Sequence, residues 1–308
     1  MEQRFLVFKD VAETNNITLS AKNLHMSQPS VSLQIKDLEY AYGTCFFDRS
    51  NKGVTLTKEG KIFYESVRTI LNILDRCKEE MSAVAKNQRR VICLGTSSTI
   101  GEYILPNILA LLFKSHPSVD FKVKIANTES ISQAVLENNF HIGLIEGPTS
   151  QHKDLTVESF WDDELVVVVP YSHPWASRTS ISLAELPNER LVTREAGSGT
   201  RKVMEMAFKE RGLDPDQLNV TMELGSTQAI KQVVAAGLGI SMISSLTVSN
   251  ECDRKIFKTL RIQDAPVSRS LSILTNARTS QTKDELILIS LLHDQELIAN
   301  SLSKDYMN

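Results

Sequence analysis

The stretch TLSAKNLHMSQPSVSLQIKDLEYAYGTCFFDRSNKGVTLTKEG, residues 18–60, decides the fold of the N-terminal part of the chain. Residues 18–24 fit one short helix, for which the Thr18 hydroxyl serves as a cap. A turn follows, after which Ser27 is placed to cap a second helix and Pro29 fits the first turn of that helix. The spacing therefore predicts two short helices joined by a tight turn.

The second of these helices has two chemically different faces. Apolar side chains recur at spacings of four, three and four residues, so they share one face and we expect them to pack inward. These are Val31, Ile35, Leu38 and Tyr42. The opposite face and its flanks carry Pro29, Ser30, Ser32, Leu33, Gln34, Lys36 and Tyr40. Because Gln pairs with adenine, and Ser and Lys reach bases or phosphates, this edge fits a helix in a major groove.

Two further elements flank this pair of helices. Apolar spacing over residues 5–12 predicts an earlier helix that ends near Asn15. After the second helix, apolar residues flank the turn at 50–53, a hairpin pattern whose tip carries Arg49 and Lys52. We interpret this hairpin as a basic wing. Basic and acidic residues are equally numerous in this part of the chain, so the pattern alone leaves a small protein-binding domain as the alternative to DNA binding.

A heptad pattern follows the wing. Thr57 is placed to cap a helix, and no Gly or Pro interrupts residues 61–90, which span about 45 Å as a helix. The apolar residues at alternating spacings of four and three are Phe63, Val67, Ile70, Leu74, Cys77, Met81 and Val84. This seam favours a coiled coil between two copies, since paired recognition helices read palindromic half-sites. The alternative is an amphipathic helix that lies on its own domain.

The remainder of the chain alternates between strand and helix patterns. The expected strands are 91–96, 121–126, 141–146, 164–170, 191–194, 220–224, 240–243 and 270–275. The expected helices are 100–114, 130–138, 200–211, 227–236 and a terminal helix at 283–301. This order predicts two α/β lobes with a cleft between them.

Four of the expected strand-to-helix corners are rich in hydroxyl groups. Ligands bind at such corners, where helix N-termini offer free N–H groups and a positive dipole end to a carboxylate, sulfate or phosphate. Each hydroxyl alone is more typical of a simple helix cap, but four corners in register favour a site. Arg194 and Arg201 are candidates for a clamp on the anion, with surface salt bridges as the alternative. The candidate effector-binding residues are Thr96, Ser97, Ser98, Thr99, Thr128, Ser130, Ser198, Gly199, Thr200, Ser226 and Thr227.

The sequence carries no enzymatic motif. Residues 196–199, AGSG, fail the GxSxG pattern at its first position, and residues 237–239, GLG, lack the third glycine of a dinucleotide fingerprint. The four cysteines and six histidines are scattered, without the spacing of metal ligands. We therefore expect neither catalysis nor a metal site. The alternative is a solute-binding protein or a small-molecule enzyme with a helical N-terminal extension.

Composition limits the setting of the protein. With 42% hydrophobic and 23% charged residues, the chain has the balance of a globular protein. Its longest apolar run, residues 165–170, is far shorter than the roughly 20 residues that span a bilayer, and no signal-peptide core follows Met1. We expect a cytoplasmic protein with no membrane partner. The net charge of −3 means that any DNA contact depends on a local surface.

The chain resembles the LysR-type transcriptional regulators over nearly its whole length. In the first part, the motifs SQPSVS, LE, FxR and LTxxG resemble the family's winged helix-turn-helix. In the second part, TSSTIGEYILP, DDELVVVVPYSHPWA, REAGSGT and GSTQAIKQVVAAGLGIS resemble its effector domain. The resemblance is nearest to the branch that includes regulators of sulfur assimilation and carbon fixation.

The resemblance implies an α/β multidomain protein with three parts. They are a winged helix-turn-helix at 1–58, a coiled-coil linker helix for dimerisation at 59–90, and an effector domain of the periplasmic-binding-protein type at 91–308. In that effector domain, lobe I comprises about 91–162 and 266–308, and lobe II about 163–265. The implied function is sequence-specific regulation of transcription, modulated by a small anionic metabolite between the lobes, with no other cofactor.

The resemblance also implies partners and DNA contacts. The partners are promoter or operator double-stranded DNA, further copies of the chain in a homodimer and homotetramer, the small-molecule effector, and RNA polymerase. The implied DNA-binding residues are Ser27, Gln28, Pro29, Ser30, Ser32, Leu33, Gln34, Lys36, Arg49 and Lys52. Many relatives have a basic residue where Leu33 stands, which puts one base or phosphate contact in doubt. Ser20-Ala21 departs mildly from the usual small pair in the preceding helix.

Overall fold

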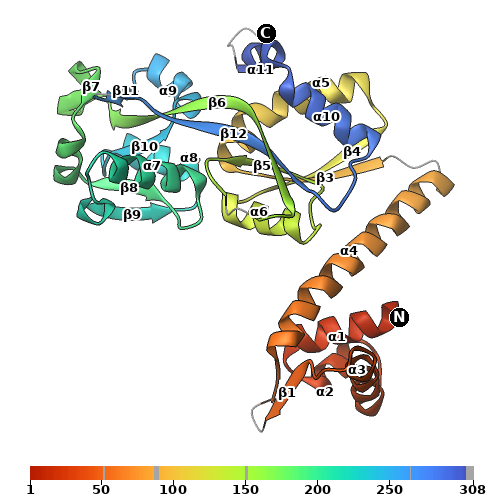
Figure 1. The fold of residues 1–308 in the computed structure, drawn as a ribbon. Coiled ribbons are helices and arrows are strands. Elements are labelled where there is room, and N and C mark those ends of the chain that lie inside the picture. Colours follow the sequence, from red (N-terminus) through yellow and green to blue (C-terminus); the bar gives the residue numbers. More distant parts are fainter. Residues whose placement is uncertain (51–52, 87–89, 150–151, 264, 303–308) are drawn as a thin grey trace. The chain divides into compact units, whose positions relative to one another are not determined.

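The computed structural model describes residues 1–50, 53–86, 90–149, 152–263 and 265–302. The chain divides into two compact units, Met1–Gln88 and Arg89–Asn308 (Figure 1). Within the described ranges, no helix has both the length and the apolar composition that crossing a membrane requires.

The first unit contains the helices and the hairpin that the sequence predicts. Its elements are α1 Glu2–Thr14, α2 Ile17–Asn23, α3 Gln28–Tyr42, β1 Phe47–Ser50, β2 Gly53–Leu56 and α4 Lys58–Lys86. Val31, Ile35 and Leu38 of α3 pack inward as expected. Tyr42 was expected to join them, but it is 52% exposed, because its ring lies at the edge of the core against Phe63, 4.6 Å between centroids.

Local caps explain where these helices begin and end. Asn15 adopts the left-handed conformation that ends α1, as predicted. The cap of α2 was wrongly assigned to Thr18: the Asn16 side chain accepts from the Leu19 N–H at 3.0 Å, so the helix begins one residue earlier. Ser27 caps α3 as predicted, accepting from the backbone N–H of Ser30 at 3.3 Å.

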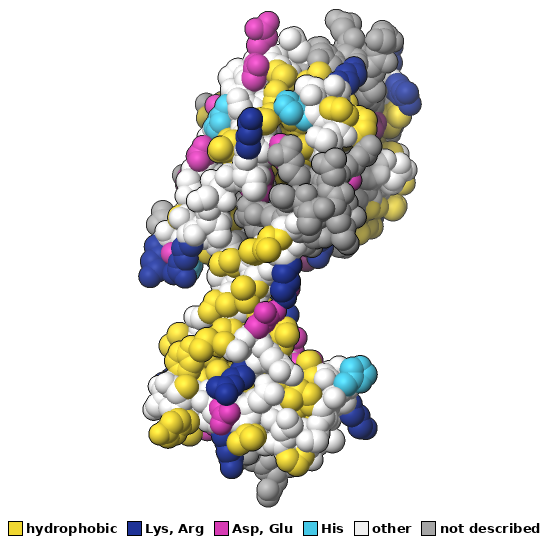
Figure 2. All heavy atoms as spheres, turned by 90° about the vertical axis from the view of Figure 1, so that its right-hand side faces the viewer, with side chains coloured by type: hydrophobic (Ala, Val, Ile, Leu, Met, Phe, Trp, Pro, Cys, Tyr) yellow, Lys and Arg dark blue, Asp and Glu magenta, His cyan; other side chains and the backbone are white. Residues whose placement is uncertain are grey.

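Helix α4 uses its heptad seam in two ways. Phe63 and Val67 are buried in the core of the first unit, so the alternative of a helix packed on its own domain holds for this end. Further along, Ile70, Cys77 and Met81 are exposed, and Ile73 beside them is exposed as well. The Val84 side chain lies outside the described residues. Figure 2 shows hydrophobic side chains gathered over this part of the first unit. Apart from the half-buried Leu74, this end of the seam is exposed to solvent within the described residues.

The second unit is built on one curled sheet. The strand order is β4-β3-β5-β12-β6-β11-β7, and β10 also pairs with β6. The strands are β3 Arg90–Thr96, β4 Val119–Ile125, β5 Ile142–Glu146, β6 Leu155–Pro170, β7 Ser180–Ile181, β10 Ser241–Ser244, β11 Phe257–Ile262 and β12 Val267–Asn276. A separate parallel pair comprises β8 Leu191–Arg194 and β9 Val220–Leu224.

Two lobes form at the two ends of this sheet (Figure 1). Lobe I is built on β3, β4 and β5, with α5 Leu105–Ser115, α6 Thr128–Leu136, α10 Lys283–His293 and α11 Gln295–Leu302. Lobe II is built on β8 to β11, with α7 Gly199–Glu210, α8 Thr227–Ala235 and α9 Ser249–Asp253. The long antiparallel strands β6 and β12 run through both lobes. Each lobe has its own hydrophobic core, which leaves the polar corners between them.

Some elements of the second unit differ from expectation. Strand β6 begins at Leu155, well before the predicted residue 164, because it continues into lobe I beside β12. The predicted terminal helix is interrupted at Asp294, whose extended backbone ends α10 and whose carboxylate accepts from the Leu297 N–H at 2.9 Å to start α11. The predicted helix at 100–114 begins with a π-helical turn, η1 Ile100–Ile104. Strand β11 and the short helical turns Pro174–Ser177, Leu183–Asn188, Pro215–Gln217 and Ser245–Thr247 were not predicted.

Candidate functional site

Helix α3 presents a polar edge near its N-terminus. Ser27, Gln28, Pro29 and Lys36 are exposed, and Leu33 is 59% exposed. Half-buried positions on the same helix are Ser30, Ser32 and Gln34. The arrangement keeps hydrogen-bonding side chains on the surface at the end of α3 that would enter a groove.

The wing forms as an antiparallel pair of strands. Arg49 on β1 lies opposite Val54 on β2, and Ser50 lies opposite Gly53. The predictions for Lys52 and for the side chain of Arg49 fall outside the described residues.

In the second unit, a buried arginine connects hydroxyls of the two lobes. Arg194 on β8 was predicted as a clamp, and its Nη1 donates to Thr227 Oγ1 at 3.3 Å while its Nη2 donates to Ser98 Oγ at 3.4 Å. Glu195 binds the same guanidinium through two oxygens, at 2.8 and 3.0 Å. The positive charge is therefore balanced within the protein, and the arginine holds the hydroxyls of two corners together.

A second buried arginine, Arg269 on β12, connects another pair of hydroxyls from the two lobes. It donates to Thr99 Oγ1 of lobe I at 3.2 Å and to Thr200 Oγ1 of lobe II at 2.8 Å. It also forms ion pairs with Asp163 at 2.7 Å and Glu146 at 3.0 Å. We did not predict Arg269 from the sequence. The signal was a single cation in the otherwise apolar and serine-rich strand VSRSLSILTN, which calls for a buried partner.

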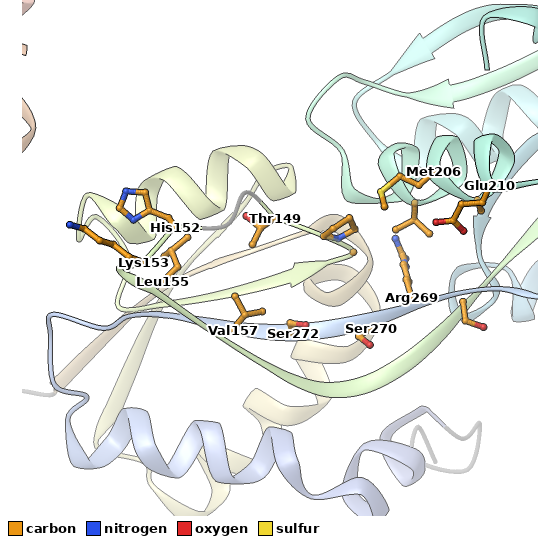
Figure 3. A pocket seen from close by; sticks show the side chains of 15 residues that line it. Thr149, His152, Lys153, Leu155, Val157, Met206, Glu210, Arg269, Ser270 and Ser272 are labelled. Carbon is orange, nitrogen blue, oxygen red and sulfur yellow. The ribbon is translucent and has the colours of Figure 1, made fainter. Parts of the chain in front are cut away.

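Figure 3 shows Arg269 rising from β12 toward α7, which carries Met206 and Glu210. Here the arginine also lines a hollow of about 780 Å³ between the segment after β5, α7 and β12. Arg269 therefore borders both this hollow and the hydroxyl groups of the corners.

The lobes also touch where α6 and α7 begin. Glu129 N–H donates to the Gly197 carbonyl at 3.2 Å. A Cβ on Gly199 would lie 1.7 Å from the Glu146 carbonyl oxygen, so only glycine permits this approach. Thr128, Ser198 and Gly199 line a hollow of about 430 Å³ at this contact. Three of the predicted residues thus surround one small cavity.

The corner hydroxyls differ in what they can still donate. Three of them already donate within the protein: Thr96 to the Ser97 carbonyl, Thr128 to the Glu146 carbonyl and Thr200 to Glu146 Oε1. Three others, Ser98, Thr99 and Thr227, accept from an arginine, which leaves their protons available. The Oγ atoms of Ser97 and Ser198 are buried and have no hydrogen-bond partner among the described residues. Five hydroxyls therefore remain as donors for a bound acceptor.

The simple capping role holds at one of these corners. Ser226 is half-buried and caps α8, accepting from the Ala229 N–H at 3.4 Å. Helix α6 is capped instead by Asn127, which sequence reasoning missed, while Ser130 is exposed. Ser198 is the N-cap residue of α7 but makes no capping bond with its side chain. Its hydroxyl is therefore left for another partner.

Further charges lie around the corners. Lys231 of α8 is buried and donates to Tyr103 Oη of lobe I at 3.0 Å and to Glu251. Burial lowers the pKa of Lys231, but the bonds to Glu251 and Tyr103 outweigh it and raise that pKa above its ordinary value. Burial raises the pKa of Glu102 on η1, against the lowering effect of Arg194 and Lys231. Lys231, Tyr103 and Glu102 were not predicted as site residues.

The predicted anion clamp does not extend to Arg201. Its guanidinium binds Glu205 at 2.7 Å and also Glu223, so the salt-bridge alternative holds for this residue. In the part of the chain that the structure describes, no group of three or more His, Cys, Asp or Glu side chains is placed to hold a metal ion.

A winged helix-turn-helix on a long helix, together with a two-lobed α/β domain with a polar cleft, defines a ligand-responsive DNA-binding regulator. Residues 3–61 match the family described as bacterial regulatory helix-turn-helix protein, lysR family, and residues 85–296 match the LysR substrate binding domain. The chain therefore belongs to the LysR family of transcriptional regulators, and its relatives are regulators of transcription, not enzymes.

Individual relatives fall in the branch that the motifs indicated. The chain is 36% identical over 285 residues to the HTH-type transcriptional regulator CysL of Bacillus subtilis, covering 92% of this chain and 94% of that protein. It is 34% identical over 263 residues to the RuBisCO operon transcriptional regulator of Allochromatium vinosum, covering 85% of each. Among solved structures, the CcmR regulatory domain of Synechocystis PCC6803 in complex with 2-PG has a TM-score of 0.61 and 28% identity, covering 67% of this chain and 96% of that one.

Proposed function

We propose that this regulator responds to a small anion held between its lobes by the hydroxyls of Ser97, Ser98, Thr99, Ser198 and Thr227. One observation carries the proposal: Ser97 Oγ and Ser198 Oγ come from different lobes, are buried, and lack a hydrogen-bond partner among the described residues. A buried hydroxyl without a partner costs about 1 to 3 kcal/mol, which a bound acceptor would relieve. The CcmR domain, solved with 2-PG, supports a small-molecule effector for this fold.

The charges around the corners favour an anion bound by neutral donors. Arg194 and Arg269 are both neutralised by carboxylates of the protein, so neither supplies a free positive charge. Hydroxyl protons and the N–H groups at the start of α7 supply the attraction instead. A sulfate, phosphate or carboxylate group presents several acceptor oxygens, which matches five donors on three corners.

We propose DNA and further copies of the chain as macromolecular partners. The polar edge of α3, comprising Ser27 to Ser32 with Leu33, Gln34 and Lys36, supports base reading in the major groove, with Arg49 and Lys52 of the wing assigned to phosphates. The exposed end of the α4 seam supports a homodimer, and we infer a tetramer as a pair of dimers. A regulator at a promoter works in the cytoplasm beside RNA polymerase, which we include as a partner.

The anion site is tested by a thermal-shift screen of sulfate, phosphate and small carboxylates, each compared with chloride at equal ionic strength. A ligand at a hundred times its Kd adds about 2.7 kcal/mol to the stability of the folded state. Thr99→Val and Ser198→Ala should each weaken binding of the best anion, whereas the matched control Ser130→Ala, at an exposed corner position, should not. If both site variants bind that anion as the wild type does, the anion site lies elsewhere.

A further inference from the structure

Arg269 differs from Arg194, the other arginine that connects the lobes, in the strand on which it stands. It stands on β12, one of the two strands that run through both lobes, and no part of its side chain is exposed. Its guanidinium reaches Thr99 of lobe I and Thr200 of lobe II at 3.2 and 2.8 Å. One side chain thus holds a hydroxyl of each lobe at a fixed separation.

The chemistry of the guanidinium sets the direction of both hydrogen bonds. An arginine has five N–H donors and no acceptor, so each hydroxyl that it contacts must accept. The Thr200 hydroxyl donates a hydrogen bond to Glu146 Oε1 at 3.1 Å, so it has no further proton to donate. Thr99 donates to no acceptor in the described residues, so its proton is free to point toward a bound group.

The orientation of the arginine is itself fixed. Asp163 Oδ2 accepts from Nε at 2.8 Å, and Glu146 Oε2 lies 3.0 Å from Nη2. Ser244 donates in turn to Asp163 Oδ1 at 2.7 Å. With the guanidinium plane held from two sides, Nη1 and Nη2 face the two threonines and have little freedom to turn away.

We propose that Arg269 is a positioning residue for the effector: without touching the ligand, it fixes Thr99 as a hydrogen-bond donor and ties that donor to Thr200 of the other lobe. The site thereby selects ligand groups with acceptor oxygens over groups that only donate, such as ammonium ions. This inference rests on the proposed anion site.

The test is equilibrium dialysis of the full-length protein with radiolabelled sulfate at constant ionic strength. Arg269→Lys keeps the charge but loses the fork that reaches both threonines, and it should raise the sulfate Kd roughly tenfold, the loss of about one hydrogen bond to a charged group. Arg261→Lys is the matched control, since Arg261 on β11 binds Glu164 on the neighbouring strand β6 and is largely exposed. It should leave the Kd unchanged.

A double-mutant cycle separates positioning from a general structural role. If Arg269 acts through Thr99, then Arg269→Lys combined with Thr99→Val should bind sulfate no more weakly than Thr99→Val alone, within about twofold. Losses that simply multiply would overturn the inference. Should Arg269→Lys fail to fold, Arg269→Met with Asp163→Asn removes one cation and one anion together, and the same cycle is run on that pair.

The outcomes distinguish this inference from the proposed function. If sulfate binding is lost in Thr99→Val and retained in both Arg269 variants, the anion site stands and the role of Arg269 is refuted. If the wild type binds none of sulfate, phosphate and the small carboxylates, or Thr99→Val binds the best of them normally, the anion site fails and the role of Arg269 fails with it.

Discussion

The recognition helix and the cleft bring polar side chains together in different ways. Helix α3, 15 residues long, carries the candidate DNA edge together with its cap Ser27, so helical geometry sets which side chains point outward. The cleft takes its hydroxyls from separate corners: Arg194 connects Ser98 with Thr227, and Arg269 connects Thr99 with Thr200. A site on one element depends on local periodicity, whereas a site between lobes depends on contacts that the chain makes only when folded.

The largest expected effect tests whether a single copy of α3 is sufficient for operator binding. Replacing Ile70 and Leu74 by Lys places charges in the exposed end of the α4 seam, where a second copy would bury them. Sedimentation should show monomers, and operator affinity should fall more than a hundredfold because only one half-site is held. As a control, Ser66→Lys with Thr69→Lys adds the same charge at polar positions of α4. This variant should leave the sedimenting mass and the operator affinity unchanged. Unchanged mass and affinity in the seam variant would mean that the seam is not the dimer interface.

The next effect tests whether α3 reads bases. Gln28→Ala and Ser32→Ala should each cost about 1 to 3 kcal/mol at the cognate operator and little on random DNA, in gel-shift titrations. Arg49→Ala should instead weaken binding to both DNAs and lower the salt slope by about one. Equal losses on the two DNAs for Gln28→Ala and Ser32→Ala would assign these residues to the backbone, not to base edges.

A smaller effect sharpens the division among the cleft hydroxyls. Thr200→Val removes a hydroxyl that bridges Arg269 and Glu146, so it should destabilise the protein by about 1 to 3 kcal/mol in urea unfolding. Ser198→Ala removes an unpartnered hydroxyl, so unliganded stability should be unchanged or higher. Equal destabilisation by the two variants would show that the hydroxyl of Ser198 has a structural partner.

The smallest effect concerns pH. Because burial raises the pKa of Glu102, this carboxyl becomes protonated at a higher pH than an ordinary glutamate. Its negative charge opposes a bound anion, so sulfate should bind more tightly as the pH falls through that raised pKa. The gain should be only on the order of 0.5 kcal/mol, because part of the Glu102 side chain stays in solvent, which screens its charge. Glu102→Gln should bind as the protonated wild type does at every pH. Sulfate titrations at several pH values measure this effect. An unchanged pH profile in the variant would show that Glu102 does not cause the pH dependence of sulfate binding.

The comparison also shows what the sequence could predict. The inward face of α3 at Val31, Ile35 and Leu38, the caps at Ser27 and Asn15 and the existence of the predicted strands follow from local spacing, and they were confirmed. The hydroxyl corners were also visible, since each follows directly after a strand. Arg269 and Lys231 were missed because their partners, Thr99 and Tyr103, are more than a hundred residues away in the sequence. Tyr42 and Thr18 were misjudged where Phe63 and Asn16 offered the better contact.

Strands β6 and β12 have a consequence for how the second unit melts. Because both strands belong to the sheet of each lobe, neither lobe can lose its strands without disrupting the other, although each has its own core. The second unit should therefore unfold as one cooperative block, and calorimetry should record a single transition for it. A ligand that contacts only a few hydroxyls between the lobes would then raise the melting temperature of the whole block.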